Sequence, residues 1–198
     1  MYIVLSLNNK NSMSIDFSKY SDLELAFVMS EKGKNSESAF MEFYKRYATG
    51  LNAYCAKILN DRVIAEDVFQ DTFIKFYETV NPKIYTNIPG YLITIARNLC
   101  LNHKRNKKRK VDITEMEFLS YDLQNYENVQ LIEFVNTAVD LLDDDYKEAL
   151  VLREYNGLEY EEIAKIMNIT EINAKTRVCR AKKKVKDLLK PYLKEINS

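Results

Sequence analysis

The stretch "LEYEEIAKIMNITEINAKTRVCRAKKKVKDLL", residues 158–189, predicts two helices joined by a tight turn. Apolar side chains recur at helical spacing on both sides of Asn168, and asparagine tolerates the left-handed backbone of a turn better than most residues. Thr170 can cap the second helix, and the small Ala164 lets the two helices approach closely. This spacing matches a helix-turn-helix, whose second helix can enter the major groove of DNA.

The second of these helices is basic on the side that faces away from its apolar stripe. Arginine and lysine can donate hydrogen bonds to guanine edges, and all of these cations can hold phosphate. A merely solvated helix face is the alternative, but turn residue, cap, small residue and basic face occur together at the spacing that DNA binding needs. The basic face carries Lys175, Thr176, Arg180, Lys183 and Lys184, with Arg177 and Lys182 on its flanks.

Charge is distributed in blocks along this chain of 198 residues, whose formal net charge is zero. Residues 81–110 contain eight lysines and arginines and no acidic residue, whereas residues 111–149 contain eleven acidic residues and one lysine. Two basic blocks separated by an acidic one suggest two polyanion-facing surfaces joined by a segment with a different role. In the first block, Lys104–Lys110 is either a solvated tail or, with Arg97 and Asn98, part of a longer polar helix face.

Few glycines and prolines punctuate the rest of the chain, which favours an all-α fold. Apolar stripes predict helices over Ser38–Leu59 and over the segment that follows a cap at Asp61. Asn81–Gly90 is predicted to be a loop because it holds two prolines and a glycine. We expect a third helix to begin near Tyr91, and a shorter helix over Asp22–Glu31.

Composition also predicts the domain boundaries. Residues 109–130 show no clean helical period and a strong acidic bias, which is typical of a linker. We therefore expect two small helical domains, at residues 20–108 and 131–190, with disordered tails at residues 1–19 and 191–198.

Catalytic and metal-binding chemistry has no visible residues in this sequence. His103 is the only histidine, and Asp143–Asp145 are interpreted as helix-capping residues because no second acidic cluster accompanies them. Cys55, Cys100 and Cys179 are odd in number and far apart, which is typical neither of a disulfide framework nor of a thiolate metal site. No segment approaches the roughly 20 apolar residues of a membrane span. We therefore expect a cytoplasmic protein that needs no cofactor.

Three motifs together resemble the sigma factors of bacterial RNA polymerase, of the small extracytoplasmic-function (ECF, group 4) type. "AEDVFQDTFIKFYE" (65–78) is similar to region 2.2 and "IPGYLITIARNLCLNHKR" (88–105) to regions 2.3 and 2.4. "LREYNGLEYEEIAKIMNITEINAKTRVCRAKKKV" (152–185) is similar to region 4. The resemblance implies a protein that binds core polymerase, directs it to specific promoters and promotes DNA melting. It also implies an anti-sigma factor as partner, and no catalysis by the chain itself.

The same resemblance implies roles for individual residues. The coiled coil of the polymerase's largest subunit would contact Asp67, Gln70, Asp71 and Phe73. The minus-ten element would meet the loop at 81–90, and the helix after it, through Tyr85, Tyr91, Arg97, Asn98, Lys104 and Arg105; the two tyrosines are suited to stacking on unpaired bases. Bases of the minus-thirty-five element would meet Lys175, Thr176, Cys179 and Arg180. Its backbone would meet Arg153, Tyr160, Thr170, Arg177 and Lys182.

Some positions depart from the family pattern. Tyr91 stands where the family has tryptophan, Asn168 replaces a turn glycine, and Asp143 stands where the family has a Leu-Pro start. Two other classes of protein remain open. A free-standing helix-turn-helix regulator would not use the acidic residues around Asp67 for polymerase binding. A helical adaptor would use its basic residues only for solubility.

Overall fold

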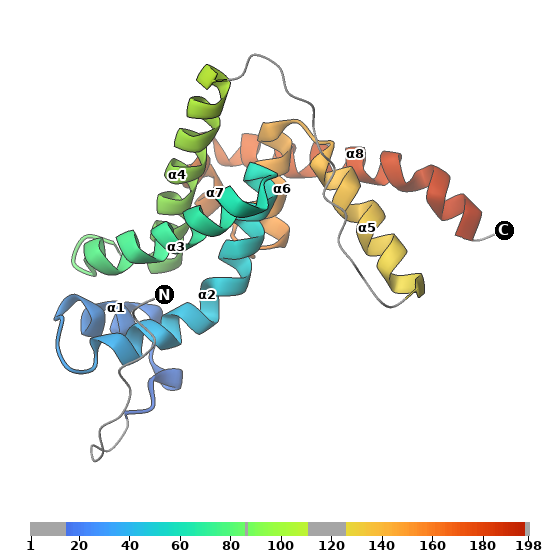
Figure 1. Ribbon diagram of the computed structural model, residues 1–198. Coiled ribbons are helices and arrows are strands. Elements are labelled where there is room, and N and C mark those ends of the chain that lie inside the picture. The colour runs from blue at the N-terminus through green and yellow to red at the C-terminus, as the bar shows by residue number, and fades with distance from the viewer. Residues whose placement is uncertain (1–14, 86, 111–125, 197–198) are drawn as a thin grey trace.

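The computed structural model describes residues 15–85, 87–110 and 126–196, and all regular elements in these ranges are helical (Figure 1). The all-α prediction is therefore confirmed for the part of the chain that the structure describes. The elements are a 3-10 turn at Phe17–Lys19 and the helices α1 (Asp22–Ser30), α2 (Ser36–Leu59), α3 (Arg62–Thr79), α4 (Ile88–Lys110), α5 (Tyr126–Asp140), α6 (Asp144–Glu154), α7 (Tyr160–Met167) and α8 (Glu171–Ile196).

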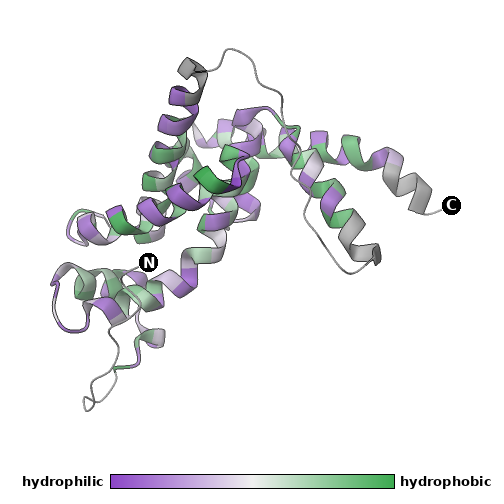
Figure 2. Ribbon diagram, in the orientation of Figure 1, coloured by the Kyte–Doolittle hydropathy of each residue, from purple (hydrophilic) through white to green (hydrophobic). Residues whose placement is uncertain are grey.

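The first four helices and the 3-10 turn form one bundle, called here the N-terminal bundle, with an aromatic core. The Phe43 and Phe76 rings stack with centroids 4.6 Å apart and planes 7° apart, which joins α2 to α3. Both rings are fully buried. Asp61 caps α3 as predicted, because its Oδ1 accepts a hydrogen bond of 3.2 Å from the Ile64 N–H. Hydrophilic and hydrophobic residues alternate along these helices, as Figure 2 shows for α3 and α4.

Two boundaries in the N-terminal bundle differ from the prediction. The helix expected near Tyr91 begins at Ile88, because the Gly90 N–H donates a hydrogen bond of 2.8 Å to Asn87 Oδ1 and proline fits the first turn of a helix. The tail expected to end at residue 19 is structured from Asp16 onward, because Phe17 is buried and the Ser18 N–H donates to the Asp16 carboxylate. Residues 1–14 of that expected tail lie outside the described residues.

Helices α5 to α8 form the second unit, called here the C-terminal bundle, whose core is aliphatic. Ile163, Ala174 and Ala181 are among its buried residues. The predicted turn is confirmed: Asn168 has φ 54° and ψ 52°, in the left-handed region. The predicted cap is also confirmed, because the Asn173 N–H donates a hydrogen bond of 3.2 Å to Thr170 Oγ1.

The linker expected at residues 109–130 is shorter at both ends. Helix α4 runs to Lys110 and α5 starts at Tyr126, so both helices extend into that range. Residues 111–125 lie outside the described part of the chain, as do residues 197 and 198 of the expected C-terminal tail. The first residues of that tail, up to Ile196, belong to α8.

The two bundles pack against each other through α2 and α4 on one side and α5, α6 and α7 on the other. Gly50, in the middle of α2, lets the turn after α6 come close: a Cβ there would lie 3.1 Å from Asn156 Nδ2. Lys57 of α2 forms an ion pair of 3.2 Å with Asp140 of α5. None of the described helices is long and apolar enough to cross a membrane.

Candidate nucleic-acid interface

Helix α8 separates its buried and exposed residues onto opposite sides. Ala174 and Val178 are buried, and they hold the helix against the rest of the C-terminal bundle. Lys175, Cys179 and Arg180, three of the four residues predicted to face bases, are exposed on the other side. The fourth, Thr176, is half-buried, and its hydroxyl donates a hydrogen bond of 2.7 Å to the Ile172 carbonyl, which leaves the hydroxyl oxygen as an acceptor.

The cations predicted to touch the DNA backbone are each paired with a carboxylate. Arg153 lies 2.9 Å from Glu159 and packs over the Tyr160 ring, with 4.9 Å between its guanidinium carbon and the ring centroid. Lys182 forms a hydrogen-bonded pair of 2.7 Å with Glu154, which raises the pKa of Lys182. Both pairs lie within the C-terminal bundle. Thr170, predicted to touch the same backbone, serves as the N-cap of α8.

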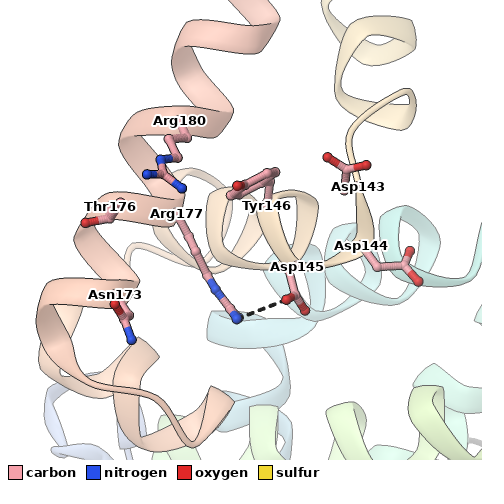
Figure 3. Close-up of a pocket in the computed structure, with 8 residues that line it drawn as sticks. All are labelled: Asp143, Asp144, Asp145, Tyr146, Asn173, Thr176, Arg177 and Arg180. Carbon is pink, nitrogen blue, oxygen red and sulfur yellow. Dashed lines mark ion pairs between the residues drawn. The ribbon is translucent and has the colours of Figure 1, made fainter.

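Asp143–Asp145, called here the acidic triad, line an open groove of about 530 Å³ together with residues of α8 (Figure 3). Each aspartate pairs with a different cation. Asp143 binds Lys184, Asp144 lies 2.6 Å from Lys104 of α4, and Asp145 lies 2.9 Å from Arg177. The hydrogen bond from Lys184 and its charge lower the pKa of Asp143.

The capping role predicted for these aspartates is only partly right. Asp143 occupies the N-cap position of α6, and Asp144 and Asp145 lie in its first turn, but the Asp143 side chain makes no capping hydrogen bond. The reason is that the side chain of Asp143 turns toward Lys184 of α8.

The two tyrosines predicted to stack on unpaired bases stack on each other. The Tyr85 and Tyr91 rings lie 3.8 Å apart between centroids with an interplanar angle of 12°. The Tyr91 hydroxyl also shares a hydrogen bond of 2.9 Å with the Thr79 hydroxyl at the end of α3. The pair therefore presents a preformed aromatic surface beside the loop that precedes α4.

The predicted minus-ten residues on α4 fall into two groups. Arg97 and Lys104 are half-buried and ion-paired with the C-terminal bundle, at 2.8 Å to Glu148 and 2.6 Å to Asp144. Asn98 and Arg105 are exposed, with Arg105 donating to the neighbouring Asn102 side chain. The contact between bundles thus covers part of the basic face of α4. Lys107–Lys110 continue α4, but their side chains lie outside the described residues.

Two family models match the chain, and each match lies within one of the two bundles. The model of Sigma-70 region 2 matches residues 43–110, and the model of Sigma-70 region 4 matches residues 135–185. Together the two matches span more than half of the chain. The chain belongs to the sigma-70 family. Sigma factors are promoter-specific initiation factors that act through RNA polymerase, rather than enzymes in the usual sense.

The chain is also similar to individual sigma factors of known sequence, and its fold is similar to solved structures. The chain is 29% identical over 152 residues to the ECF RNA polymerase sigma factor SigM of Bacillus subtilis, covering 74% of this chain and 93% of that protein. It is 27% identical over 181 residues to the RNA polymerase sigma-H factor of Pseudomonas aeruginosa, in a match that covers 82% of this chain and 92% of that protein. The sigma factor RpoE of Bartonella quintana, solved with the anti-sigma factor NepR, has a TM-score of 0.63 at 24% identity, covering 76% of this chain and 96% of that chain. CnrH, solved with the cytosolic domain of CnrY, has a TM-score of 0.60 at 18% identity. The match covers 84% of this chain and 97% of that chain.

The predicted polymerase-binding residues of this sigma factor lie on α3, and three of them are accessible. Asp67, Gln70 and Asp71 are exposed on one side of the helix. Phe73 differs from these three, because its side chain is only 4% exposed and packs 4.7 Å from Tyr44, centroid to centroid. The Phe73 ring therefore helps to hold α3 against α2.

Sequence reasoning missed Glu148, which joins the two bundles of the sigma factor. Its carboxylate is buried, accepting hydrogen bonds of 2.9 Å from the Tyr54 hydroxyl and 2.8 Å from Arg97 Nε. Burial, followed by the Glu148 charge, raises the pKa of Tyr54. The signal in the sequence was the position of Glu148 directly before the buried run Ala149–Leu152, where an unpaired carboxylate would be costly.

The cysteines and acidic residues in the described ranges of the sigma factor form no metal site. No group of three or more His, Cys, Asp or Glu residues in the described ranges could hold a metal ion. Cys55 and Cys100 are buried free thiols, and a hydrogen bond with Cys55, followed by burial, raises the pKa of Cys100. Cys179 is exposed on α8.

Proposed function

We propose that this sigma factor binds core RNA polymerase through α3, carries it to a two-part promoter and helps to melt the DNA. The observation that carries the proposal is the division of α8 into a buried side and an exposed side that bears Lys175, Cys179 and Arg180. That division is what a recognition helix needs, because one side must fix the helix while the other faces base edges.

At the minus-thirty-five element, α8 would lie in the major groove. Lys175 and Arg180 can donate to guanine O6 and N7, and Thr176 can accept from a base amino group. Arg153, Arg177 and Lys182 would hold the flanking phosphates after exchanging their present carboxylate partners for DNA. Phosphate contacts of this kind make binding fall steeply with salt.

At the minus-ten element, the Tyr85–Tyr91 pair and the exposed part of α4 would capture unpaired bases. Extruding a base costs a few kcal/mol in lost stacking and pairing, and stacking on an aromatic side chain returns about 1–3 kcal/mol per base. Asn98 and Arg105 lie on the exposed surface of α4 that follows. Melting would be driven by this capture, without a catalytic step by the sigma factor.

Use of both surfaces at once requires the two bundles to separate. Arg97 and Lys104 are occupied by Glu148 and Asp144 in the packed arrangement. Separated bundles tethered by the linker and by polymerase would bind the second promoter element at a raised effective concentration. Each bundle then needs to supply only part of the total affinity.

Run-off transcription with purified core polymerase tests the proposal. We expect transcripts to start at promoters found by mapping transcript starts after overexpression of the chain. Lys175→Ala combined with Arg180→Ala should lower initiation at least tenfold, since each base contact contributes about 1–3 kcal/mol. No initiation by the unmodified chain on any genomic promoter would refute the proposal.

Polymerase binding separates a sigma factor from a free-standing regulator. We expect Asp67→Ala with Asp71→Ala in the full chain to weaken capture of core polymerase, because both carboxylates are exposed on α3. Glu31→Ala with Glu37→Ala removes the same charge at another exposed site and should leave capture unchanged. Equal capture by both double variants would favour the regulator.

An anti-sigma factor is proposed as a further partner, and the cytoplasm as the compartment. Support comes from the RpoE and CnrH structures, which were solved as complexes with an anti-sigma factor and with the cytosolic domain of CnrY. A purified anti-sigma candidate should form a stable complex with the chain and abolish run-off transcription. Transcription that persists in the presence of such a complex would argue against this role.

A further inference from the structure

Ile172 is the most exposed of the large apolar side chains in the described ranges, at 78%. It lies in the first turn of α8. Residues three, four and seven positions apart share one side of a helix. Ile172 therefore lies on the same side of α8 as Lys175, Thr176 and Cys179, one turn closer to the start of the helix.

A single exposed apolar residue is ordinary on a protein surface, but the position of Ile172 is not ordinary. The N-terminal residues of a recognition helix are the ones that contact base edges. The side chain is β-branched and therefore stiff in a helix, and its carbonyl accepts a hydrogen bond of 2.7 Å from the Thr176 hydroxyl. Ile172 is thus a rigid apolar group at the leading end of a polar, DNA-facing surface.

The chemistry of isoleucine limits what Ile172 can recognise. It has no hydrogen-bond donor or acceptor, and the only apolar feature that a base pair presents in the major groove is the C5-methyl group of thymine. We propose that Ile172 is a specificity-determining residue that selects a thymine methyl in the minus-thirty-five element. This inference rests on the proposed function of α8, and it adds a shape contact to the hydrogen bonds of Lys175 and Arg180.

Replacing thymine by deoxyuridine tests the contact, because it removes only the methyl group. The promoter found by transcript mapping is synthesised with each minus-thirty-five thymine replaced in turn, and binding of the polymerase–sigma complex is measured. We expect one replacement to weaken binding by roughly fourfold, the usual contribution of one buried methyl-sized group. Ile172→Ala should bind thymine and deoxyuridine templates equally, and Ile172→Val should retain most of the discrimination.

Several outcomes would overturn the assignment. Equal binding of all templates by the unmodified protein, an element without thymine, or the same deoxyuridine effect in Ile172→Ala would each do so. Ile172→Ala that weakens binding equally on every template would indicate a contact with protein instead. Each of these results can occur while the unmodified chain still initiates transcription, so they are distinct from failure of the proposed function. Thermal unfolding should be nearly unchanged in both variants, because Ile172 packs against little.

The acidic triad carries a second inference from a separate observation. Its three aspartates pair with Lys184, Arg177 and Lys104, all of them cations from the two basic surfaces expected to face DNA. Two of these cations belong to α8 and one to α4, so the triad touches both surfaces at once. All three aspartates are exposed, with Asp144, for example, 65% exposed.

The aspartate oxygens lie beside these cations, at 2.6 Å from Lys104 and 2.9 Å from Arg177. Phosphate oxygens of DNA would bind the same cations in their place. We infer that the triad is an intramolecular competitor of DNA, which lowers the affinity of the free chain for nucleic acid of any sequence. Exposed ion pairs are individually weak, so DNA phosphates can displace them once polymerase has placed the bundles.

Non-specific DNA provides the test, since it needs neither polymerase nor a promoter. The triple variant Asp143→Asn, Asp144→Asn, Asp145→Asn keeps good capping residues at the start of α6. We expect the free chain with these changes to bind a random double-stranded oligonucleotide about tenfold more tightly, because three exposed ion pairs no longer compete with the DNA phosphates. The dependence on salt should become steeper, by up to about 0.9 in log–log slope per released cation.

A charge-matched control separates local competition from net charge. Glu31→Gln, Glu37→Gln and Glu133→Gln change the net charge equally at exposed sites away from the groove. This control should change affinity by about twofold or less, because long-range fields are screened beyond roughly 8 Å at physiological salt. Equal tightening in both triple variants, or no tightening in the first, would overturn the inference.

Discussion

The two bundles differ in how available their DNA-facing side chains are, although both surfaces are basic. On α4, Arg97 and Lys104 are held by acids of the C-terminal bundle. On α8, Lys175 and Arg180 face solvent. The acids of α6 and of its N-cap pair with Arg97 and Lys104 on α4 and with Arg177 and Lys184 on α8, and they leave Lys175 and Arg180 without an acidic partner among the described residues. Basic character alone therefore does not decide which surface is ready to bind; the neighbouring element decides it.

The cores of the two bundles differ as well. The N-terminal bundle is built on stacked aromatic rings such as Phe43 and Phe76, which bury large areas per residue. The C-terminal bundle relies on small and aliphatic residues such as Ala174, Val178 and Ala181, which let short helices pack closely. We expect the first bundle to keep its shape alone and the second to draw part of its stability from the contact between them.

The largest expected effect tests that difference in core packing. Phe43→Ala removes a fully buried ring and should lower the free energy of unfolding by about 3–5 kcal/mol. Ile163→Val, at a fully buried site of the C-terminal bundle, should cost about 0.5–1.5 kcal/mol. Urea unfolding followed by circular dichroism measures both. A loss well below about 3 kcal/mol for Phe43→Ala would show that the stacked rings contribute less to stability than their burial implies.

The contact between bundles should be weakened next most strongly by Glu148→Gln. The change removes the charge that Arg97 binds, and hydrogen bonds to charged groups contribute about 1.5–3 kcal/mol. We expect the bundles to separate, seen as a larger radius of gyration in small-angle X-ray scattering. Glu154→Gln is the control, because Glu154 pairs with Lys182 inside the C-terminal bundle. An unchanged radius for Glu148→Gln would mean that apolar packing alone holds the bundles together.

Matched helix caps give a smaller effect that should be equal in the two bundles. Asp61→Ala and Thr170→Ala each remove a side-chain acceptor at a helix start and should cost about 1 kcal/mol. Asp61→Asn and Thr170→Ser keep an acceptor and serve as controls. Thermal unfolding measures the loss of stability in each variant. A clearly smaller loss for Thr170→Ala than for Asp61→Ala would show that the cap of α8 contributes less to its bundle than the cap of α3 does.

The smallest effect concerns the pH dependence of one pair across the groove. Lys184 lowers the pKa of Asp143, so the pair contributes stability above the ordinary aspartate pKa and loses it as the pH falls through the lowered value. Carboxyl chemical shifts should show Asp143 titrating below the usual aspartate range, and Lys184→Ala should return it toward that range. An unchanged titration in Lys184→Ala would show that the pair does not persist in solution.

Local chemistry made several elements predictable. Asn168 adopts the left-handed turn, Asp61 and Thr170 cap their helices, and the apolar spacing along α8 places Ala174 inward. Each of these depends on residues only a few positions apart, which the sequence displays directly. The start of α4 was missed because the Asn87 side chain overrides the loop signal of the prolines. The burial of Phe73 could not be predicted in the same way, because a motif gives the position of a residue and not its burial.

The sequence by itself determined the helix-turn-helix, the two basic surfaces and the membership in the sigma-70 family, because these depend on short-range periodicity and on motifs of fixed spacing. Only the tertiary structure decided which cations are free. Residues 40 to 51 positions apart form the pairs Lys104–Asp144 and Arg97–Glu148. Whether two such side chains meet depends on how whole helices pack, which no local pattern records. The same packing set the acidic triad against both basic surfaces and left Ile172 exposed.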